Sequence, residues 1–253
     1  MLVTAVFFYQ ASANVAKQIT SQSVIAISAH RLRQTGDLAE VPPDVADALL
    51  AAARWFRHEP GDDIVSGDEP VACVHALADG VAAMRTGLAA ADVAAFHFLH
   101  PGQWLGFTAL FNPHRQLSTG HVTARSSCIT ARIGTIQIEA LLAAKPGWWR
   151  WLGGFAIRYG DTATGVCADL SLRDSRRRCF AMLLRAANVR YAGSPATVTA
   201  LIGQDELGAI VNLSRNTINI ILNDAEAGGF LTARYRAIDL HDVAALRKIV
   251  EEG

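Results

Sequence analysis

The sequence predicts an α+β protein with a β-rich N-terminal part, one long helix and a C-terminal winged helix-turn-helix. Two short apolar stripes with helical spacing, joined by a turn, lie at residues 204–222. A Gly-Gly break and a basic hairpin follow at residues 228–240. Gly and Pro residues punctuate residues 51–140 at intervals suited to short antiparallel strands, which indicates a jelly roll or barrel.

The segment at residues 204–222, QDELGAIVNLSRNTINIIL, predicts two helices that cross closely. Asn212 lies at the turn and tolerates a left-handed backbone, while Ser214 is a natural N-cap for the second helix. Such a second helix fits the major groove of DNA. An ordinary pair of core helices is the alternative, and the basic hairpin tip Arg234-Tyr235-Arg236 favours the DNA-binding interpretation.

Candidate DNA contacts follow from the chemistry of the outward positions. Arg215 suits a phosphate or guanine, Asn216 and Asn219 suit adenine edges, and Ile220 suits a thymine methyl group. Residues 173–195 contain six arginines and one aspartate. Such a run is usually a solvated helix face, with contact to the DNA backbone as the second interpretation. The candidates are Gln204, Ser214, Arg215, Asn216, Thr217, Asn219, Ile220, Arg234, Arg236, Arg176 and Arg177.

Length and composition predict two domains. The chain has 253 residues, 51% of them hydrophobic, and its 23 basic and 23 acidic residues give no global positive field. The four cysteines, at positions 73, 128, 167 and 179, have no CxxC spacing, so we expect no metal site. We also expect a reduced, cytoplasmic protein without a cofactor. Cys73 and His75 share one strand face, and a buried structural pair is the favoured interpretation. No apolar run reaches transmembrane length.

Residues 1–41 are expected to be a loosely ordered extension, or the product of an upstream start codon. Their opening, MLVTAVFFYQASA, partly resembles a secretion signal but lacks a basic start. The remaining domains are expected at residues 42–145 for the β-rich part, 146–172 for the long helix and 173–253 for the winged helix-turn-helix.

The long helix is expected to begin at Pro146 and to carry a heptad seam for pairing with an identical helix. Packing of that stripe on its own β domain is the alternative. Four glycines in the helix cost roughly 1 kcal/mol each relative to Ala, and either close helix approach or fraying would explain them. The seam candidates are Leu152, Ala156, Tyr159, Ala163, Val166 and Leu170.

Five segments of the chain are informative together: RHEPGDDIVSGDE (57–69), LADG (77–80), LHPGQWLGFTALF (99–111), RDSRRRCFAMLLRAA (173–187) and LSRNTI (213–218). In these segments and in the order of its parts, the chain resembles the family of bacterial cyclic-AMP receptor proteins and fumarate-nitrate reduction regulators. The resemblance implies a cyclic-nucleotide-binding-like β-roll, a dimerisation helix, and a winged helix that binds palindromic promoter DNA as a homodimer. A contact with RNA polymerase is implied as well.

The resemblance weakens at the ligand site. Nucleotide-binding members carry Gly-Glu there and Arg-Ser or Arg-Thr eleven residues after the Gly, whereas Phe107 and Leu117 stand here in place of Glu and Arg. A buried phosphate without its guanidinium is costly, so we expect no cyclic-nucleotide binding. Iron-sulfur members of the family carry a cysteine cluster near the N-terminus, and this chain has no cysteine before Cys73. Haem-binding members carry a metal ligand in the loop after Pro-Gly, where this chain has no Cys or His. The pocket candidates are Gly106, Phe107, Thr108, Leu117, Ser118, Thr119 and Thr164.

Two functional classes remain. The first is a homodimeric, DNA-binding transcription regulator whose effector the sequence does not identify. The second is a protein-interaction module of the same fold that has lost specific DNA recognition. An enzyme is not expected, because no nucleophile-base or paired-carboxylate pattern is found.

Overall fold

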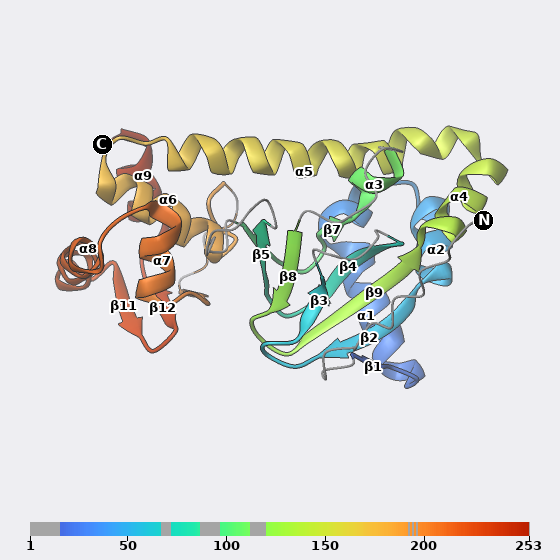
Figure 1. The fold of residues 1–253 in the computed structure, drawn as a ribbon, viewed down its shortest axis with the longest axis horizontal. Helices are drawn as coiled ribbons and strands as arrows, with labels where there is room; N and C mark the ends of the chain where they lie inside the picture. The colour runs from blue at the N-terminus through green and yellow to red at the C-terminus, as the bar shows by residue number, and fades with distance from the viewer. Residues whose placement is uncertain are drawn as a thin grey trace, which may run out of the picture.

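The computed structural model describes residues 16–66, 72–86, 97–111, 120–191, 193, 195 and 197–252. A β-rich part and a C-terminal helical part lie side by side along one long helix, α5 (Figure 1). This arrangement confirms the predicted fold class. Within the described residues, no helix is both long enough and apolar enough to span a bilayer.

Two antiparallel sheets form the β-rich part, the β-roll. One has the strand order β1-β2-β9-β4-β7 and the other β3-β8-β5-β6. Their bounds are β1 Lys17–Gln18, β2 Arg54–His58, β3 Asp63–Val65, β4 Cys73–Asp79, β5 Ala82–Thr86, β6 His97–Leu99, β7 Trp104–Leu105, β8 Gly120–Ala124 and β9 Cys128–Gly134. Side chains alternate along β4, so Val74 and Ala76 pack against helices while Leu77 packs between the sheets.

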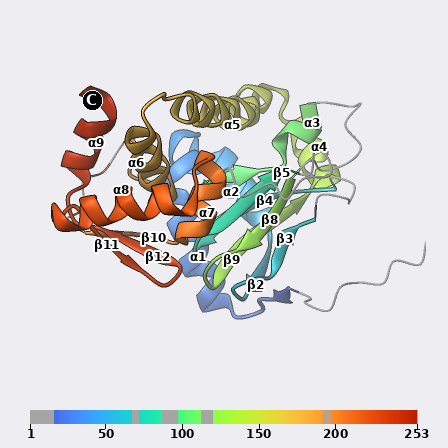
Figure 2. The same ribbon diagram turned by 60° about the vertical axis from the view of Figure 1, so that its left-hand side comes forward.

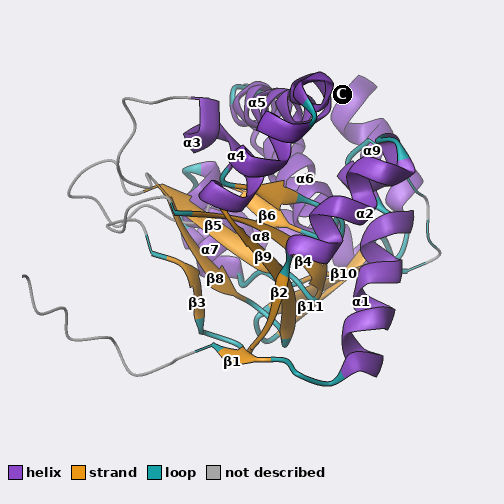
Figure 3. Cartoon of the chain, turned by 90° about the vertical axis from the view of Figure 1, so that its right-hand side faces the viewer, coloured by secondary structure: helices purple, strands orange, loops and turns teal. Residues whose placement is uncertain are grey.

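Helices α1 (Gln22–Gln34) and α2 (Pro43–Ala52), joined by the 3-10 turn η1 (Gly36–Glu40), pack on the five-stranded sheet (Figure 3). Leu32 of α1 and Leu38 of η1 are buried. The expectation of a loosely ordered extension is therefore wrong for residues 16–41, because their apolar side chains have a sheet face to bury. Residues 1–15 lie outside the described part of the chain.

Polar contacts also fasten η1 to the rest of the β-roll. The Asp37 carboxylate accepts hydrogen bonds from Trp104 N at 3.1 Å and from Arg158 Nε at 2.6 Å. A Cβ at Gly36 would lie 2.4 Å from Gly102 O, so only glycine allows these two chain segments to approach so closely. The N-terminal segment therefore braces both strand β7 and the long helix.

The long helix begins later and ends earlier than the sequence predicted. Helices α4 (Thr135–Ala144) and α5 (Trp149–Leu170) are joined by the 3-10 turn η2 (Pro146–Trp148). After α5 the chain turns, and Asp174 starts α6 (Ser175–Ala186) by accepting a hydrogen bond from Arg177 N at 2.7 Å. An aspartate at this position is a favourable N-cap, so α6 begins here as a separate helix.

The C-terminal part contains α6, α7 (Gln204–Val211), α8 (Arg215–Ala227) and α9 (Val243–Glu252), with the sheet β10-β12-β11. The strands are β10 Val198–Ala200, β11 Leu231–Arg234 and β12 Ala237–Leu240. Its core includes Phe180, Leu222 and Leu246, and Phe98 of the β-roll joins this core. Arg125, after β8, also forms an ion pair with Glu206 of α7.

Candidate nucleic-acid interface

Local hydrogen bonds set the turn between α7 and α8. Asn212 adopts the predicted left-handed conformation with φ of 53°, and Leu213 N donates to Gly208 O at 2.9 Å. Ser214 is the N-cap of α8, where its Oγ accepts from Thr217 N at 3.1 Å. The turn therefore has the backbone and the cap that the sequence predicted.

A close crossing of α7 and α8 defines the angle between them. A Cβ on Gly208 would lie 3.0 Å from Leu213 O and 3.3 Å from the Ile218 side chain, so a larger residue would push the helices apart. Val211, Ile218 and Leu222 are buried beneath the crossing. This inner face orients α8 with its other face outward, beside the β11–β12 hairpin (Figure 2).

Most of the predicted contact residues of α8 lie on its outer face. Arg215 and Asn216 are exposed, and the Ile220 side chain is 54% exposed although it is aliphatic. Thr217 and Asn219 are half-buried. In the first two turns of α8, the arginine offers a charge to a DNA groove and the asparagine offers a bidentate amide. The exposed isoleucine offers an apolar contact of the size of a methyl group.

The first turn of α7 lies close to the start of α8. Gln204 is half-buried at the N-terminus of α7. The Arg215 guanidinium lies 3.4 Å from the Asp205 carboxylate, with both side chains about three-quarters exposed. Such an exposed pair contributes little to stability, so Arg215 remains available to a phosphate or base.

The β11–β12 hairpin forms the predicted wing. Tyr235 at its tip is 90% exposed, and Arg236 has φ of 58°, which closes the turn. Arg234 pairs with Asp239, whose pKa is lowered by the hydrogen bond from Thr199 and by Arg234. Arg236 has no hydrogen-bond or ion-pair partner among the residues that the structure describes. The two predicted wing arginines therefore differ, with Arg236 the freer cation.

The arginine run that begins α6 has a structural role that the sequence interpretation missed. Arg177 donates to the carbonyl of Val250 at 2.7 Å, at the C-terminal end of α9. Arg178 donates to Val211 O at 2.9 Å, at the end of α7. Both cap helix C-termini, where unpaired carbonyls attract cations. The prediction that Arg177 is a DNA contact is therefore not supported by its position, while the neighbouring Arg176 is exposed.

Next to Gly106 of the predicted ligand site, aromatic side chains form a buried cluster. Gly106 has φ of 94°, as its tight turn requires. Phe107 is buried, and its ring lies 5.0 Å from that of Phe155 of α5 and 5.8 Å from that of Trp104. Thr164 is exposed on α5, away from this cluster, and donates to Gly160 O at 3.0 Å. Leu117, Ser118, Thr119 and the Thr108 side chain lie outside the described residues.

The predicted dimer seam faces the protein's own interior. Leu152 and Val166 are almost fully buried within the chain, and the Tyr159 hydroxyl lies 3.2 Å from Met84 Sδ of the β-roll. Ala156 packs on the β-roll core, Ala163 is half-buried, and Leu170 packs on the winged-helix core. The alternative weighed for this stripe, packing on its own chain, is therefore correct.

A second stripe runs along the outer face of α5, and the sequence interpretation overlooked it. It consists of Gly153, Ile157, Gly160, Thr164 and Cys167, at steps of 4, 3, 4 and 3 residues. The Ile157 side chain is 67% exposed, and a Cβ at Gly153 or Gly160 would meet no atom within 4 Å. In the sequence, this stripe was marked by small residues spaced regularly around one isoleucine. The larger side chains of the inner stripe obscured that pattern.

Comparisons with known proteins identify the fold. No protein-family model matches the chain. The curated HTH-type transcriptional regulator Cmr of Mycobacterium tuberculosis is 25% identical over 219 residues, which cover 84% of this chain and 82% of Cmr. FixK2 of Bradyrhizobium japonicum has a TM-score of 0.65 at 17% identity, covering 79% of this chain and 98% of that one. A CRP/FNR-family regulator of Thermus thermophilus has a TM-score of 0.61 at 18% identity, covering 78% and 98%.

This chain has the Crp/Fnr fold. The resemblance that the sequence motifs indicated is thereby confirmed. Within this Crp/Fnr fold, Phe107 lies in the segment that follows the short strand β7, and its ring contributes to the core instead of a carboxylate.

Buried histidines are a further feature of this β-roll. Burial lowers the pKa of His75 to about 3 and the pKa values of His97 and His100 to about 4. His58, whose pKa burial also lowers, is hydrogen-bonded to Thr130 Oγ1 at 3.0 Å. No group of three potential metal ligands occurs in the described part of the chain.

These histidines predict that acid destabilises the Crp/Fnr fold of this chain. Below pH 6.5 the unfolded chain binds protons at His75, His97 and His100 that the folded chain does not bind until the pH approaches 4. The free energy of unfolding should therefore fall as the pH is lowered from 6.5, by on the order of 1 kcal/mol per pH unit for each of these histidines. Urea unfolding between pH 7.5 and 5 measures this slope. His75→Phe should make the slope less steep by the contribution of one histidine, whereas the same change at the exposed His30 should leave it unchanged, and a stability independent of pH would contradict the prediction.

Proposed function

We propose that this protein is a DNA-binding transcription regulator that acts as a homodimer on promoter DNA. The observation that carries the proposal is the two-sided character of α8. Ile218 and Leu222 bury its inner face, whereas Arg215, Asn216 and Ile220 project from its outer face. Similarity to transcription regulators over most of the chain supports it. A contact with RNA polymerase stays a prediction from the family resemblance.

In this proposal, base recognition and binding to the DNA backbone come from different elements. The first turns of α8 enter the major groove, where Asn216 pairs with an adenine edge and Ile220 meets a thymine methyl group. Arg236 at the wing and Arg215 at the start of α8 neutralise phosphates. Arg177 is excluded from this set because its guanidinium already caps α9.

Substitutions on α8 and on the wing should separate these two roles. Asn216→Ala should lower the ratio of specific to scrambled binding, because removing a bidentate pair with a base costs roughly 1–3 kcal/mol. Arg236→Ala should weaken binding to both duplexes equally and reduce the salt slope by about one, since one phosphate is no longer neutralised. Fluorescence anisotropy on duplexes selected from random sequences, over a salt series, measures both effects.

Asn223→Ala is the matched control, since this exposed asparagine lies farther along α8. It should leave the specificity ratio unchanged. If Asn216→Ala leaves the ratio intact while Arg236→Ala abolishes it, the two roles are assigned backwards. If no duplex is enriched by selection, a protein-interaction module of the same fold becomes the better account.

The dimer is assigned to the outer stripe of α5 in place of the predicted inner one. The stripe has the 4-3 spacing of a helix pair, and its glycines allow two backbones to approach closely. A two-fold symmetric dimer is the commonest assembly. It would cover Ile157, which is otherwise an exposed aliphatic side chain.

Ile157→Glu should therefore yield a folded monomer, because two carboxylates would face each other in the seam. Ile136→Glu is the control, since that isoleucine of α4 is 79% exposed but lies off α5. Val166→Glu should instead unfold the protein, because it places a charge in its own core. Sedimentation at micromolar concentration, with circular dichroism for folding, distinguishes these outcomes. A wild-type monomer would contradict the assignment.

The aromatic cluster predicts that the β-roll does not bind a cyclic nucleotide. Phe107 supplies no acceptor for ribose hydroxyls, and its ring is buried against that of Phe155. Isothermal titration with cyclic AMP and cyclic GMP should give no heat of binding up to high micromolar concentration. Micromolar affinity for either nucleotide would overturn this part of the proposal.

A further inference from the structure

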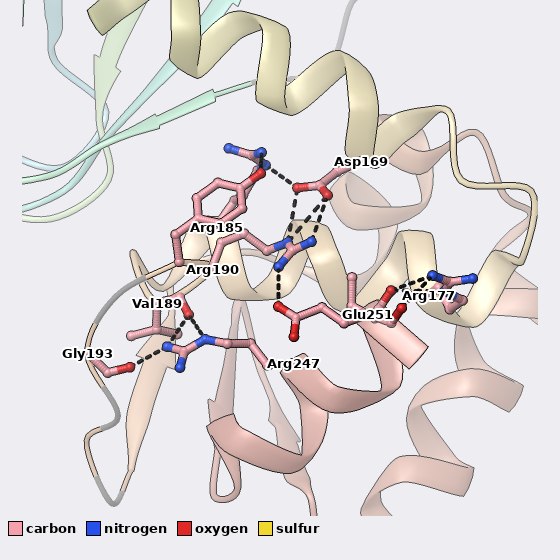
Figure 4. Close-up of polar contacts among 10 residues, drawn as sticks. Asp169, Arg177, Arg185, Val189, Arg190, Gly193, Arg247 and Glu251 are labelled. Atoms are coloured by element: carbon pink, nitrogen blue, oxygen red, sulfur yellow. Dashed lines mark hydrogen bonds and ion pairs between the residues drawn. The ribbon is translucent and has the colours of Figure 1, made fainter. Parts of the chain in front are cut away.

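A buried cluster of charged side chains joins α5 to the winged helix. Asp169 lies in the last turn of α5, and its side chain is 5% exposed. Arg185 of α6 and Arg190, which follows α6, converge on it with side chains 8% and 12% exposed (Figure 4). A carboxylate near a helix C-terminus is unfavourable by itself. The two guanidinium groups offset that cost.

The hydrogen bonds in this cluster are specific in geometry. Arg185 Nε donates to Asp169 Oδ2 at 2.6 Å. Arg190 uses two nitrogens, with Nη2 3.2 Å from Oδ1 and Nε 3.3 Å from both carboxylate oxygens. Arg190 also lies 3.5 Å from Glu251 of α9. One carboxylate on α5 is thus connected to α6 and α9, which are both elements of the winged helix.

The surface of α5 is shaped to admit these arginines. A Cβ at Gly165 would lie 2.7 Å from Arg185 Nη2 and 3.3 Å from the Tyr191 hydroxyl. Tyr191 accepts a hydrogen bond from Arg185 Nη2 at 2.8 Å and stacks with both guanidinium groups. Gly165 therefore has a different role from Gly153 and Gly160, because its missing side chain leaves room inside the chain.

The position of the cluster relates it to DNA binding. In the proposed dimer the outer face of α5 follows the symmetry axis, so the direction in which α6 leaves α5 determines where each α8 lies. Two recognition helices must match half-sites about one DNA turn apart, ~34 Å. Symmetry doubles any angular error at the joint.

We propose that Asp169 is the positioning residue that sets the half-site spacing of this protein. Its buried carboxylate fixes the angle between α5 and the winged helix through Arg185 and Arg190. The proposal rests on the proposed function of dimeric DNA binding, and it assigns to Asp169 no contact with DNA.

The test measures spacing preference with the full chain. Duplexes carry the selected palindrome with its centre lengthened or shortened by one to three base pairs, and a further duplex carries one half-site. Gly165→Ala displaces the tip of Arg185 without removing a charge, and Asp169→Asn removes the charge itself. Gly154→Ala is the matched control, since it lies on the same helix and a Cβ there meets only Arg158 Nη1, at 3.8 Å.

For the wild type and for Gly154→Ala, we expect one spacing to be preferred at least tenfold. For Gly165→Ala and Asp169→Asn, the preference should fall below about threefold or move by a base pair, with half-site affinity unchanged within twofold. An unchanged spacing profile in both variants overturns the proposal. An equal weakening on the half-site also overturns it, because the variants would then act on the folding of the winged helix. A wild type that prefers no duplex refutes the proposed function itself, which separates the two failures.

Discussion

The burial of one face of α5 is the constraint on which the remaining structure depends. Leu152 and Phe155 at one end of this helix belong to the core that α1, α2 and the five-stranded sheet share. Toward the other end, Leu170 packs on the winged-helix core, and Asp169 binds two of its arginines. At 22 residues, α5 spans about 33 Å, enough to support both parts on one rigid element. The exposed stripe around Ile157 lies on an adjoining face of the same helix.

The N-terminal segment and the aromatic cluster together hold strand β7 of the β-roll against α5. Asp37 binds both Trp104 N and Arg158, so η1 secures the strand that carries Trp104 against α5. Burial raises the pKa of Asp37, opposed by the hydrogen bond and charge of Arg158. Phe107 and Phe155 complete the apolar interior beside this contact. The position where the family resemblance places a ribose-binding carboxylate thus contributes to stability through packing.

Arginines in the winged helix have two distinct roles. Those whose donors reach backbone carbonyls or buried carboxylates hold the domain together, as Arg178 does at the end of α7 and Arg185 does at Asp169. Those on α8 and at the wing tip, Arg215 and Arg236, point to solvent. A near-neutral overall charge is therefore compatible with the DNA contact proposed for α8 and the wing, because the placement of cations matters for such a contact as well as their number.

Local patterns in the sequence determined the helix-turn-helix, the wing and the strand-rich N-terminal part. Asn212 and Ser214 act within a few residues of their own positions, so their effect on the backbone follows from the sequence. Which face of α5 is buried could not be derived from such local patterns. Two stripes with heptad spacing compete on that helix, and only the packing of Leu152 and Val166 decides which one is buried. Likewise, the partners of Arg177 and Asp169 are distant in sequence, so the roles of these charges were decided by tertiary structure alone.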